Sequence, residues 1–242
     1  MKKVLTLLVT LCLSLLASEA EDIIKKVDHN MRGKSVYMQL QMHIQTKHYQ
    51  RNMEMKSWSE GKDKSFVKIL KPSRDRGITF LNLKGEMWQY VPKIERIIKI
   101  PPSMMLQNWM GSDITNDDMV KQSSIVDDYD AKLLSKKGKI VTIELTPKAD
   151  AAVVWGKIES TIDTTHYTNI KDIYYDENGE RVRAFIYDKV KRFGSYYLPT
   201  IWQVKPFDKP GHLTTITIED ARYDTAIDAA YFTKSALKRF SH

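Results

Sequence analysis

Cysteine is almost absent from this chain of 242 residues, which contains a single one, Cys12. Cys12 lies within an apolar stretch near the N-terminus and follows Leu11, whereas a lipoprotein cleavage site needs a small residue directly before its cysteine. We therefore expect no lipid anchor at this position. Removal of the stretch would leave a mature chain without thiols, which excludes disulfide bonds, thiol catalysis and thiolate metal sites.

Long hydrophobic runs are also scarce, because only residues 4–16 form one. Met1-Lys2-Lys3 precede this run and Ser18-Glu19-Ala20 follow it, an order typical of a cleavable secretory signal peptide. The run is too short for a good membrane-spanning helix. An uncleaved anchor is the alternative, but acidic residues follow directly and no cationic stop appears. We expect residues 1–20 to be the signal peptide and residues 21–242 to be a single periplasmic domain.

The chain lacks the sequence signatures of the common enzyme classes. It has no nucleophile elbow, no glycine-rich phosphate loop and no dinucleotide-binding fingerprint. Two Ser-x-x-Lys matches occur, but the partner motifs of penicillin-recognising enzymes are missing. The aspartate pairs at 117–118 and 127–128 are better explained by a helix N-terminus and a turn than by acid/base catalysis. The six histidines are scattered, with no pair at the helical spacing of a zinc site. We therefore predict a protein that is not an enzyme, with no catalytic residues, no cofactor and no metal site.

Positive charge exceeds negative charge, with 38 Lys and Arg against 30 Asp and Glu. An excess of this sign favours anionic head groups or an acidic partner, and export argues against nucleic acid. The alternative interpretation is that the lysines keep exposed strand faces soluble and protect the sheet edges.

Alternation of apolar and polar residues dominates the mature chain. Residues 34–45 show it most clearly, with five apolar side chains at every second position, which predicts a long strand with one apolar face. Similar segments recur as far as residue 223, with hairpin signals such as Lys84-Gly85 between them. Short helices are expected at residues 20–32 and 229–240. Ten to twelve strands in series, without alternating helices, predict an antiparallel meander.

Residues 103–122 interrupt this pattern after Pro101-Pro102. Apolar residues at helical spacing, then Gly111 and a capping-box pattern at Thr115 and Asp118, predict a helix–turn–helix insertion. Because methionine is flexible, a lid rich in Met and Trp over the concave face of a curved sheet would make an expandable pocket. For any single residue an ordinary core is the alternative. We expect the pocket and lid to bind an apolar ligand through Trp88, Tyr90, Met104, Met105, Leu106, Trp109 and Met110.

Two segments resemble the outer-membrane lipoprotein-sorting protein family, which is related to the periplasmic lipoprotein carrier LolA. They are residues 85–97, with Trp88, Tyr90, Pro92 and Arg96, and the run Met110-Gly111-Ser112-Asp113; the closing Phe232-Thr233 and Leu237 are similar to the C-terminal helix of that family. The resemblance implies a mainly β fold with short helices, in which an open antiparallel half-barrel carries a helical lid and N- and C-terminal helices. It also implies carriage of acyl chains across the periplasm beside a large inner-membrane lipid exporter. No residue matches the cavity arginine of the lipoprotein carrier, which leaves the nature of the cargo open.

These features favour a monomeric periplasmic carrier that binds lipid or lipoprotein acyl chains and moves them toward the outer membrane. Its partners would be an inner-membrane lipid exporter and an outer-membrane acceptor. The alternative is a periplasmic sensor or regulatory binding protein of the same fold, which would bind a signalling protein instead of ferrying lipid. An outer-membrane acceptor should carry a lipobox cysteine and an enzyme on lipid or cell wall should carry a catalytic constellation, and the sequence has neither.

The signal peptide gives the first prediction. Small residues at the third and first positions before the cut should direct cleavage after Ala20. N-terminal sequencing of the protein recovered from the periplasm should therefore begin at Glu21. Recovery of intact Met1 in the membrane fraction would contradict this prediction.

Overall fold

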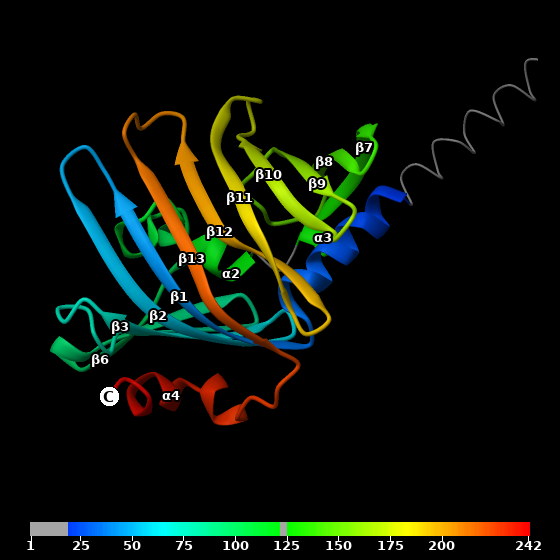
Figure 1. Ribbon diagram of the computed structural model, residues 1–242. Helices are drawn as coiled ribbons and strands as arrows, with labels where there is room; N and C mark the ends of the chain where they lie inside the picture. Colours follow the sequence, from blue (N-terminus) through cyan, green and yellow to red (C-terminus); the bar gives the residue numbers. More distant parts are fainter. Residues whose placement is uncertain (1–18, 122–124) are drawn as a thin grey trace, which may run out of the picture.

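A single antiparallel sheet of 13 strands organises the computed structural model (Figure 1), which describes residues 19–121 and 125–242. The predicted signal peptide, including Cys12, lies almost wholly outside the described residues. The sheet is bent and open, which confirms the expected half-barrel. Within the described residues, no helix combines the length and the apolar character needed to cross a membrane.

The strand order explains how the two halves of the chain meet. The first six strands are β1 (Ser35–Gln45), β2 (Gln50–Glu60), β3 (Lys64–Lys71), β4 (Thr79–Leu83), β5 (Glu86–Val91) and β6 (Arg96–Lys99). The other seven are β7 (Tyr129–Lys137), β8 (Ile140–Pro147), β9 (Lys157–Asp163), β10 (Thr168–Tyr175), β11 (Arg181–Phe193), β12 (Tyr196–Pro206) and β13 (Leu213–Tyr223). The chain runs outward from β1 to the edge strand β6, reappears at the opposite edge as β7, and returns to β13, which pairs with β1. The predicted meander is therefore two meanders joined at the centre of the sheet.

The alternating pattern places one apolar row on the concave face. In β1 the side chains of Val36, Met38, Leu40, Met42 and Ile44 are all buried. Met42 lies opposite Met53 of β2 on one side and Ile216 of β13 on the other. Because residues directly opposite in antiparallel strands project from the same face, these rows merge into one apolar surface across the centre of the sheet.

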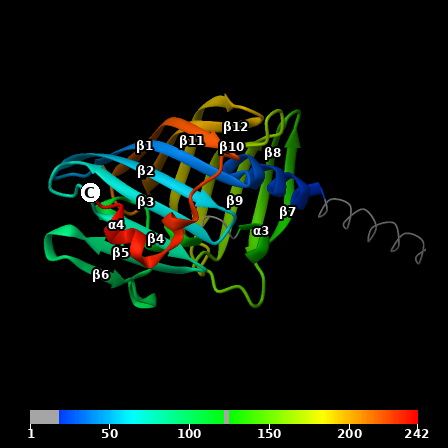
Figure 2. The same cartoon turned by 90° about the horizontal axis from the view of Figure 1, so that it is seen from below.

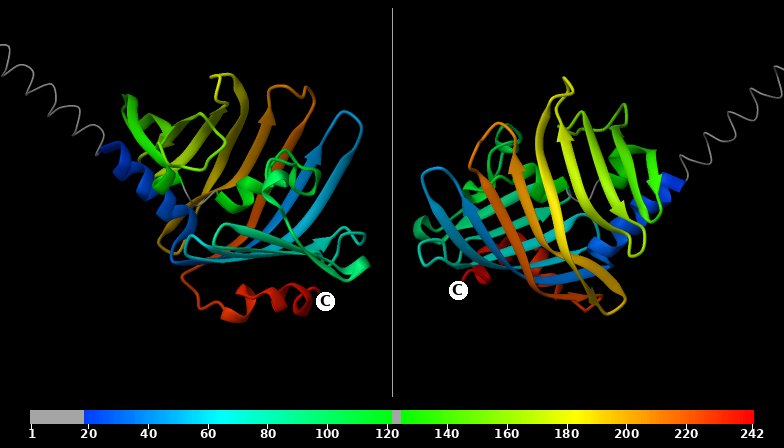
Figure 3. Two further views of the ribbon diagram at one scale, coloured as in Figure 1. Left: turned by 180° about the vertical axis from the view of Figure 1, so that it is seen from behind. Right: turned by 45° about the horizontal axis from the view of Figure 1, so that its top comes forward.

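Residues 100–121 and 125–128 lie between the two edges in the sequence and cross this concave face (Figure 3). They form two 3₁₀ turns, η2 (Pro102–Met104) and η3 (Trp109–Gly111), and two short helices, α2 (Asn116–Lys121) and α3 (Ile125–Asp128). We call these residues the crossing segment. The single helix predicted for the apolar residues 104–110 is wrong, because Asn108 is extended between the two 3₁₀ turns and Met110 is left-handed with φ of 53°. The capping box is confirmed: the Thr115 amide donates to Asp118 Oδ2 at 2.7 Å and the Asp118 amide donates to Thr115 Oγ1 at 3.1 Å.

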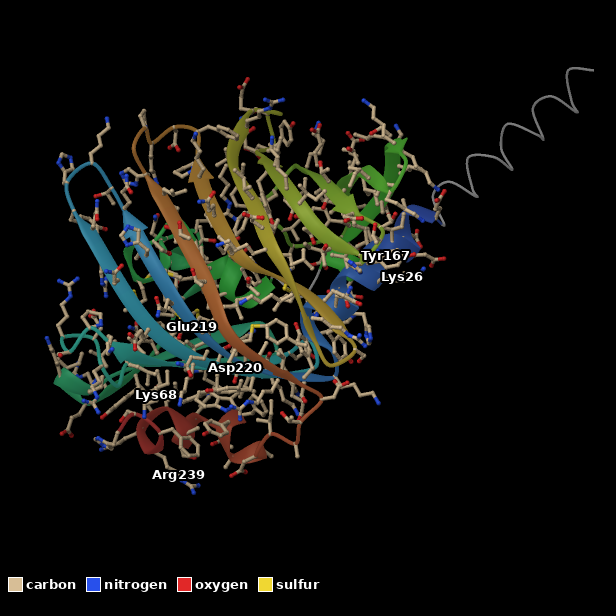
Figure 4. The ribbon with its side chains drawn as sticks, viewed as in Figure 1. Lys26, Lys68, Tyr167, Glu219, Asp220 and Arg239 are labelled. Atoms are coloured by element: carbon tan, nitrogen blue, oxygen red, sulfur yellow. The ribbon has the colours of Figure 1, made fainter. Side chains whose placement is uncertain are left out.

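Helices cover both faces of the sheet near its ends. The described residues 19–32 are helical up to Gly33, as expected, and pack on the inner side of β7–β9. Lys26 Nζ of this helix donates to the Tyr167 hydroxyl at 3.2 Å in the turn before β10 (Figure 4). The C-terminal residues form η4 (Ala229–Phe232) and α4 (Lys234–Arg239) beneath β3–β5 (Figure 2). The single helix expected at 229–240 is interrupted at Thr233, whose side chain accepts the amide of Ala236 and caps α4.

A second core therefore lies on the convex face, between the sheet and α4. Phe66, Leu81, Trp88 and Tyr90 point to this face and pack against Phe232, Ala236 and Leu237. The Thr79 hydroxyl donates to the Leu237 carbonyl at 2.7 Å and adds a buried polar tie between strand and helix. The Lys68 ammonium binds the carbonyl of His242 at the chain end.

The α4 contact gives the second prediction. Leu237 is fully buried, so Leu237→Ala should lower the free energy of unfolding by about 2–5 kcal/mol, the usual cost of such a truncation in a core. Urea unfolding followed by circular dichroism measures this. Leu106→Ala is the control: Leu106 is 58% exposed, so its loss should change stability by less than about 0.5 kcal/mol. A small effect of Leu237→Ala would show that α4 is not part of the core.

Candidate functional site

A cavity of about 280 Å³ lies between the concave face of the sheet, the crossing segment and the N-terminal helix. Strands from both halves of the sheet contribute to its wall, together with α2 and the helix at residues 19–32. Most of the lining side chains are aliphatic, aromatic or methionine, and the methionines are Met31, Met38, Met42, Met55 and Met119. Because methionine is unbranched and polarizable, such a wall can adapt to apolar ligands of different shape.

The predicted site residues in the crossing segment have different environments. Trp109 lines the cavity, is only 1% exposed, and packs on Phe80 with ring centroids 5.1 Å apart. Met105 and Met110 pack partly buried against the same concave core. Met104 and Leu106, in contrast, point to the surface with exposures of 37% and 58%. The crossing segment does cover the concave face, but only Trp109 among its five predicted site residues belongs to the cavity wall.

The placement of Trp88 and Tyr90 on the concave face is wrong. Both lie on the convex face, between the sheet and α4, so that the sheet separates them from the cavity. The neighbouring Met87 is the β5 residue that packs into the concave core. The physical reason is that both faces of β5 are buried, one by the crossing segment and the other by α4. Alternation separates the two faces of a strand but does not identify which of them lines a cavity.

Arg183 of β11 is a central residue that the sequence did not reveal. Its guanidinium forms a bidentate ion pair with Asp118 of α2, with Nη1 donating to Oδ2 at 2.7 Å, and Nη1 also donates to the Asp113 carbonyl at 3.3 Å. The arginine is 3% exposed and stacks against Trp155 and Tyr174 at 4.4 and 4.8 Å from the ring centroids. The attraction between Asp118 and Arg183 offsets the desolvation cost of the two charges, so removal of either partner would leave a buried charge unpaired. The pair attaches α2 to β11, in the half of the sheet formed by β7–β13.

A second polar group in the wall is the carboxyl of Asp172 on β10. It accepts hydrogen bonds from the Ser160 hydroxyl at 2.5 Å, the Tyr187 hydroxyl at 2.9 Å and the Asn169 amide at 2.9 Å. Burial raises the pKa of the Asp172 carboxyl above its ordinary value, and the three hydrogen bonds oppose this shift without cancelling it. Burial likewise raises the pKa of the Tyr187 hydroxyl. The polar groups of this cluster are satisfied by one another.

The described part of the chain contains no group of three or more His, Cys, Asp or Glu side chains that could hold a metal ion. Asp113 is an example of a polar residue that makes structural hydrogen bonds. Its carboxylate accepts a hydrogen bond from the Thr214 hydroxyl at 2.7 Å and lies 3.4 Å from His212 Nδ1. This contact ties the crossing segment to β13. The arrangement as a whole can enclose an apolar group without a polar partner for it.

Comparisons with known proteins agree with the fold. A family model described as an uncharacterized protein matches residues 61–239, which is more than half of the chain, and the chain belongs to that family. No curated protein matches the sequence. Three crystal structures are similar in fold. A DUF1329 family protein from Desulfovibrio piger is 22% identical, with 92% of this chain and 99% of that chain covered and a TM-score of 0.84.

The other two structures carry the names that the sequence resemblance suggested. A putative outer membrane lipoprotein-sorting protein domain from Vibrio parahaemolyticus is 19% identical, covers 92% of this chain and 100% of its own, and has a TM-score of 0.80. A LolA superfamily protein from Nitrosomonas europaea is 20% identical, covers 90% and 98%, and has a TM-score of 0.75. The resemblance stated from the sequence is thereby confirmed at the level of fold.

The Asp172 carboxyl gives the third prediction. A carboxyl whose pKa is higher in the folded than in the unfolded state binds more protons when folded, so its contribution to stability declines as pH rises from its unfolded pKa through its folded pKa. Asp172→Asn removes this titration. An ordinary Asp pKa is about 4. As pH rises from about 4 to about 8, the free energy of unfolding should therefore decrease less in the variant than in the wild type. Urea unfolding at several pH values measures it, and an unchanged pH profile would contradict the prediction.

Proposed function

We propose that this protein is a periplasmic carrier that binds acyl chains of lipid or lipoprotein in its concave cavity and moves them toward the outer membrane. The observation that carries the proposal is the Met-rich apolar cavity beneath a segment that crosses the open sheet. A pocket that offers apolar contact and few free polar groups suits an alkyl chain better than a sugar, peptide or nucleotide. No step of this function requires covalent chemistry, a cofactor or a metal ion.

The size of the cavity bears on how the cargo would be held. Typical ligand pockets enclose roughly 300–1,000 Å³, so about 280 Å³ shelters part of an acyl chain. Each buried methylene contributes roughly 0.8 kcal/mol, and a partly sheltered chain therefore gains useful affinity. A longer cargo would need additional volume, which methionine side chains can provide by changing rotamer.

The fold resemblance and the expected export support a proposal for the direction of transport and for the partners. We propose an inner-membrane lipid exporter as the donor and an outer-membrane protein or membrane as the acceptor, with the carrier acting as a monomer. Mass spectrometry of lipid extracted from the protein purified from the periplasm tests the cargo. Recovery of acyl lipid at near-stoichiometric amount would support the carrier. Recovery of a stoichiometric protein partner with an empty cavity would instead support the regulatory sensor of the same fold.

The cavity gives the fourth prediction. Met119 of α2 lines the cavity and is only partly buried, so Met119→Glu should place an unpaired charge against the acyl chain. Because such a charge costs several kcal/mol in an apolar site, the affinity for a fluorescent fatty acid should fall by about tenfold or more. Titration of the probe into the purified protein measures this.

Met104→Glu is the matched control, because Met104 belongs to the same segment but lies outside the cavity wall and at the surface. It should bind the probe like the wild type. Thermal unfolding of both variants establishes that the comparison is made between folded proteins. Equal affinity of Met119→Glu and wild type would exclude the cavity as the acyl site.

A further inference from the structure

The edge of the sheet at β6 has an unusual concentration of exposed apolar side chains. Of the twelve large apolar residues that are exposed in the described chain, five lie within residues 94–106. They are Ile94 at 55%, Ile97 at 44%, Ile98 at 40%, Met104 at 37% and Leu106 at 58%. We call residues 92–106 the β6 edge. Exposed apolar residues are unremarkable when single, but a cluster of them marks an interaction surface.

The two isoleucines of β6 point to opposite faces of the sheet. Ile97 lies opposite Tyr90, on the face covered by α4, whereas Ile98 lies opposite Gln89, on the concave side. All four residues of β6 are exposed, and among the described strands none pairs with the outer edge of β6. A protein bound to one face of the sheet would cover only one of these isoleucines. A layer into which the edge itself is immersed would cover both.

Positive charge surrounds these apolar residues. Lys93, Arg96 and Lys99 belong to the β6 edge, and Lys234 and Lys238 of α4 reach it from the convex side. Lys99 and Lys234 both lie over the ring of Trp88, at 5.7 and 4.5 Å from its centroid. Two carboxylates face these five cations: Glu86 pairs with Lys99 at 2.5 Å, and Glu95 lies 3.9 Å from Lys238. The edge therefore keeps an excess of positive charge.

Protection of an edge strand explains only part of this composition. Short edge strands with lysines avoid pairing with other chains, and β6 is short and basic. Such protection calls for polar side chains on both faces, however, and the exposed isoleucines are contrary to it. Apolar side chains interleaved with cations are the composition that lies at the surface of an anionic bilayer, where the former enter the head-group layer and the latter contact phosphates.

We propose that the β6 edge is a docking surface for an anionic lipid bilayer. The edge is continuous with the cavity wall, because Ile100 of the β6 edge and Trp109 just beyond it are both buried in the concave core and Trp109 lines the cavity. Docking by this edge brings the start of the crossing segment to the head-group layer. The proposal concerns a surface outside the cavity and does not depend on the identity of the cargo.

Co-sedimentation with vesicles tests the proposal. The probes are vesicles of phosphatidylethanolamine with phosphatidylglycerol and vesicles of phosphatidylcholine alone, and all proteins carry the same N-terminus. Wild type should bind the anionic vesicles more tightly, and the double variant Ile97→Ser with Ile98→Ser should lose at least fivefold of that affinity. Lys93→Glu with Arg96→Glu should lose a similar amount at low salt, and the difference from wild type should shrink as salt is raised.

The matched control is Leu134→Ser with Ile140→Ser, which removes two exposed apolar residues at the opposite edge of the same sheet, of 45% and 37% exposure. It should bind vesicles like the wild type. Thermal unfolding should show that all variants are folded, because every substituted position is exposed. Binding of a fluorescent fatty acid to the cavity should be unchanged in the β6 variants, which separates failure of this proposal from failure of the carrier function.

Three outcomes would overturn the proposal. They are the failure of wild type to sediment with anionic vesicles, wild-type affinity in the Ile97/Ile98 variant, and an equal loss of affinity in the opposite-edge control. A protein partner captured through the β6 edge, in the absence of vesicle binding, would assign the surface to that protein instead.

Discussion

The pairing of β1 with β13 is the constraint on which the rest of the structure depends. These two strands come from opposite ends of the described chain and lie side by side at the centre of the sheet. Because each half of the chain then extends outward, β6 and β7 become opposite edges although only residues 100–128 separate them. The chain must therefore cross one face of the sheet. It crosses the concave face, where the apolar row of β1 would otherwise be exposed to water, and the cavity lies between that row and the crossing segment.

Much of the sheet could be predicted from the sequence, because local patterns determine strands and hairpins. The alternation in β1 and the turn at Lys84-Gly85 depend only on neighbours in sequence, and both predictions are confirmed. The capping box of α2 is local in the same way. The side of the sheet on which Trp88 and Tyr90 lie is not local. It is decided by α4, which is far away in sequence and covers the second face of β5. A strand buried on both faces has no polar side from which the orientation could be inferred.

Arg183 shows the same limit for the candidate site. In the sequence it is one of many basic residues and lies in a strand with other charged positions. Its role depends on Asp118, whose place above β11 follows only from the crossing topology. The buried ion pair is a weak source of stability, since the attraction offsets a large desolvation cost. Its value lies in specificity, because α2 has one position on the sheet at which both charges are paired. The pair thus fixes the position of α2, whose residues Asp118 and Met119 line the cavity.

The cavity can change its volume in two ways that differ in cost. Rotation of Met31, Met38, Met42, Met55 or Met119 alters the wall while the backbone stays in place, and long unbranched side chains do this with little strain. Movement of the crossing segment would enlarge the cavity further, but it would separate Asp118 from Arg183, Asp113 from Thr214 and Trp109 from Phe80. Because the first of these contacts is a buried ion pair, a large opening requires that water or another group solvates both charges. Small differences between apolar ligands can thus be accommodated by methionines alone, whereas a bulky ligand requires that the Asp118–Arg183 pair separates.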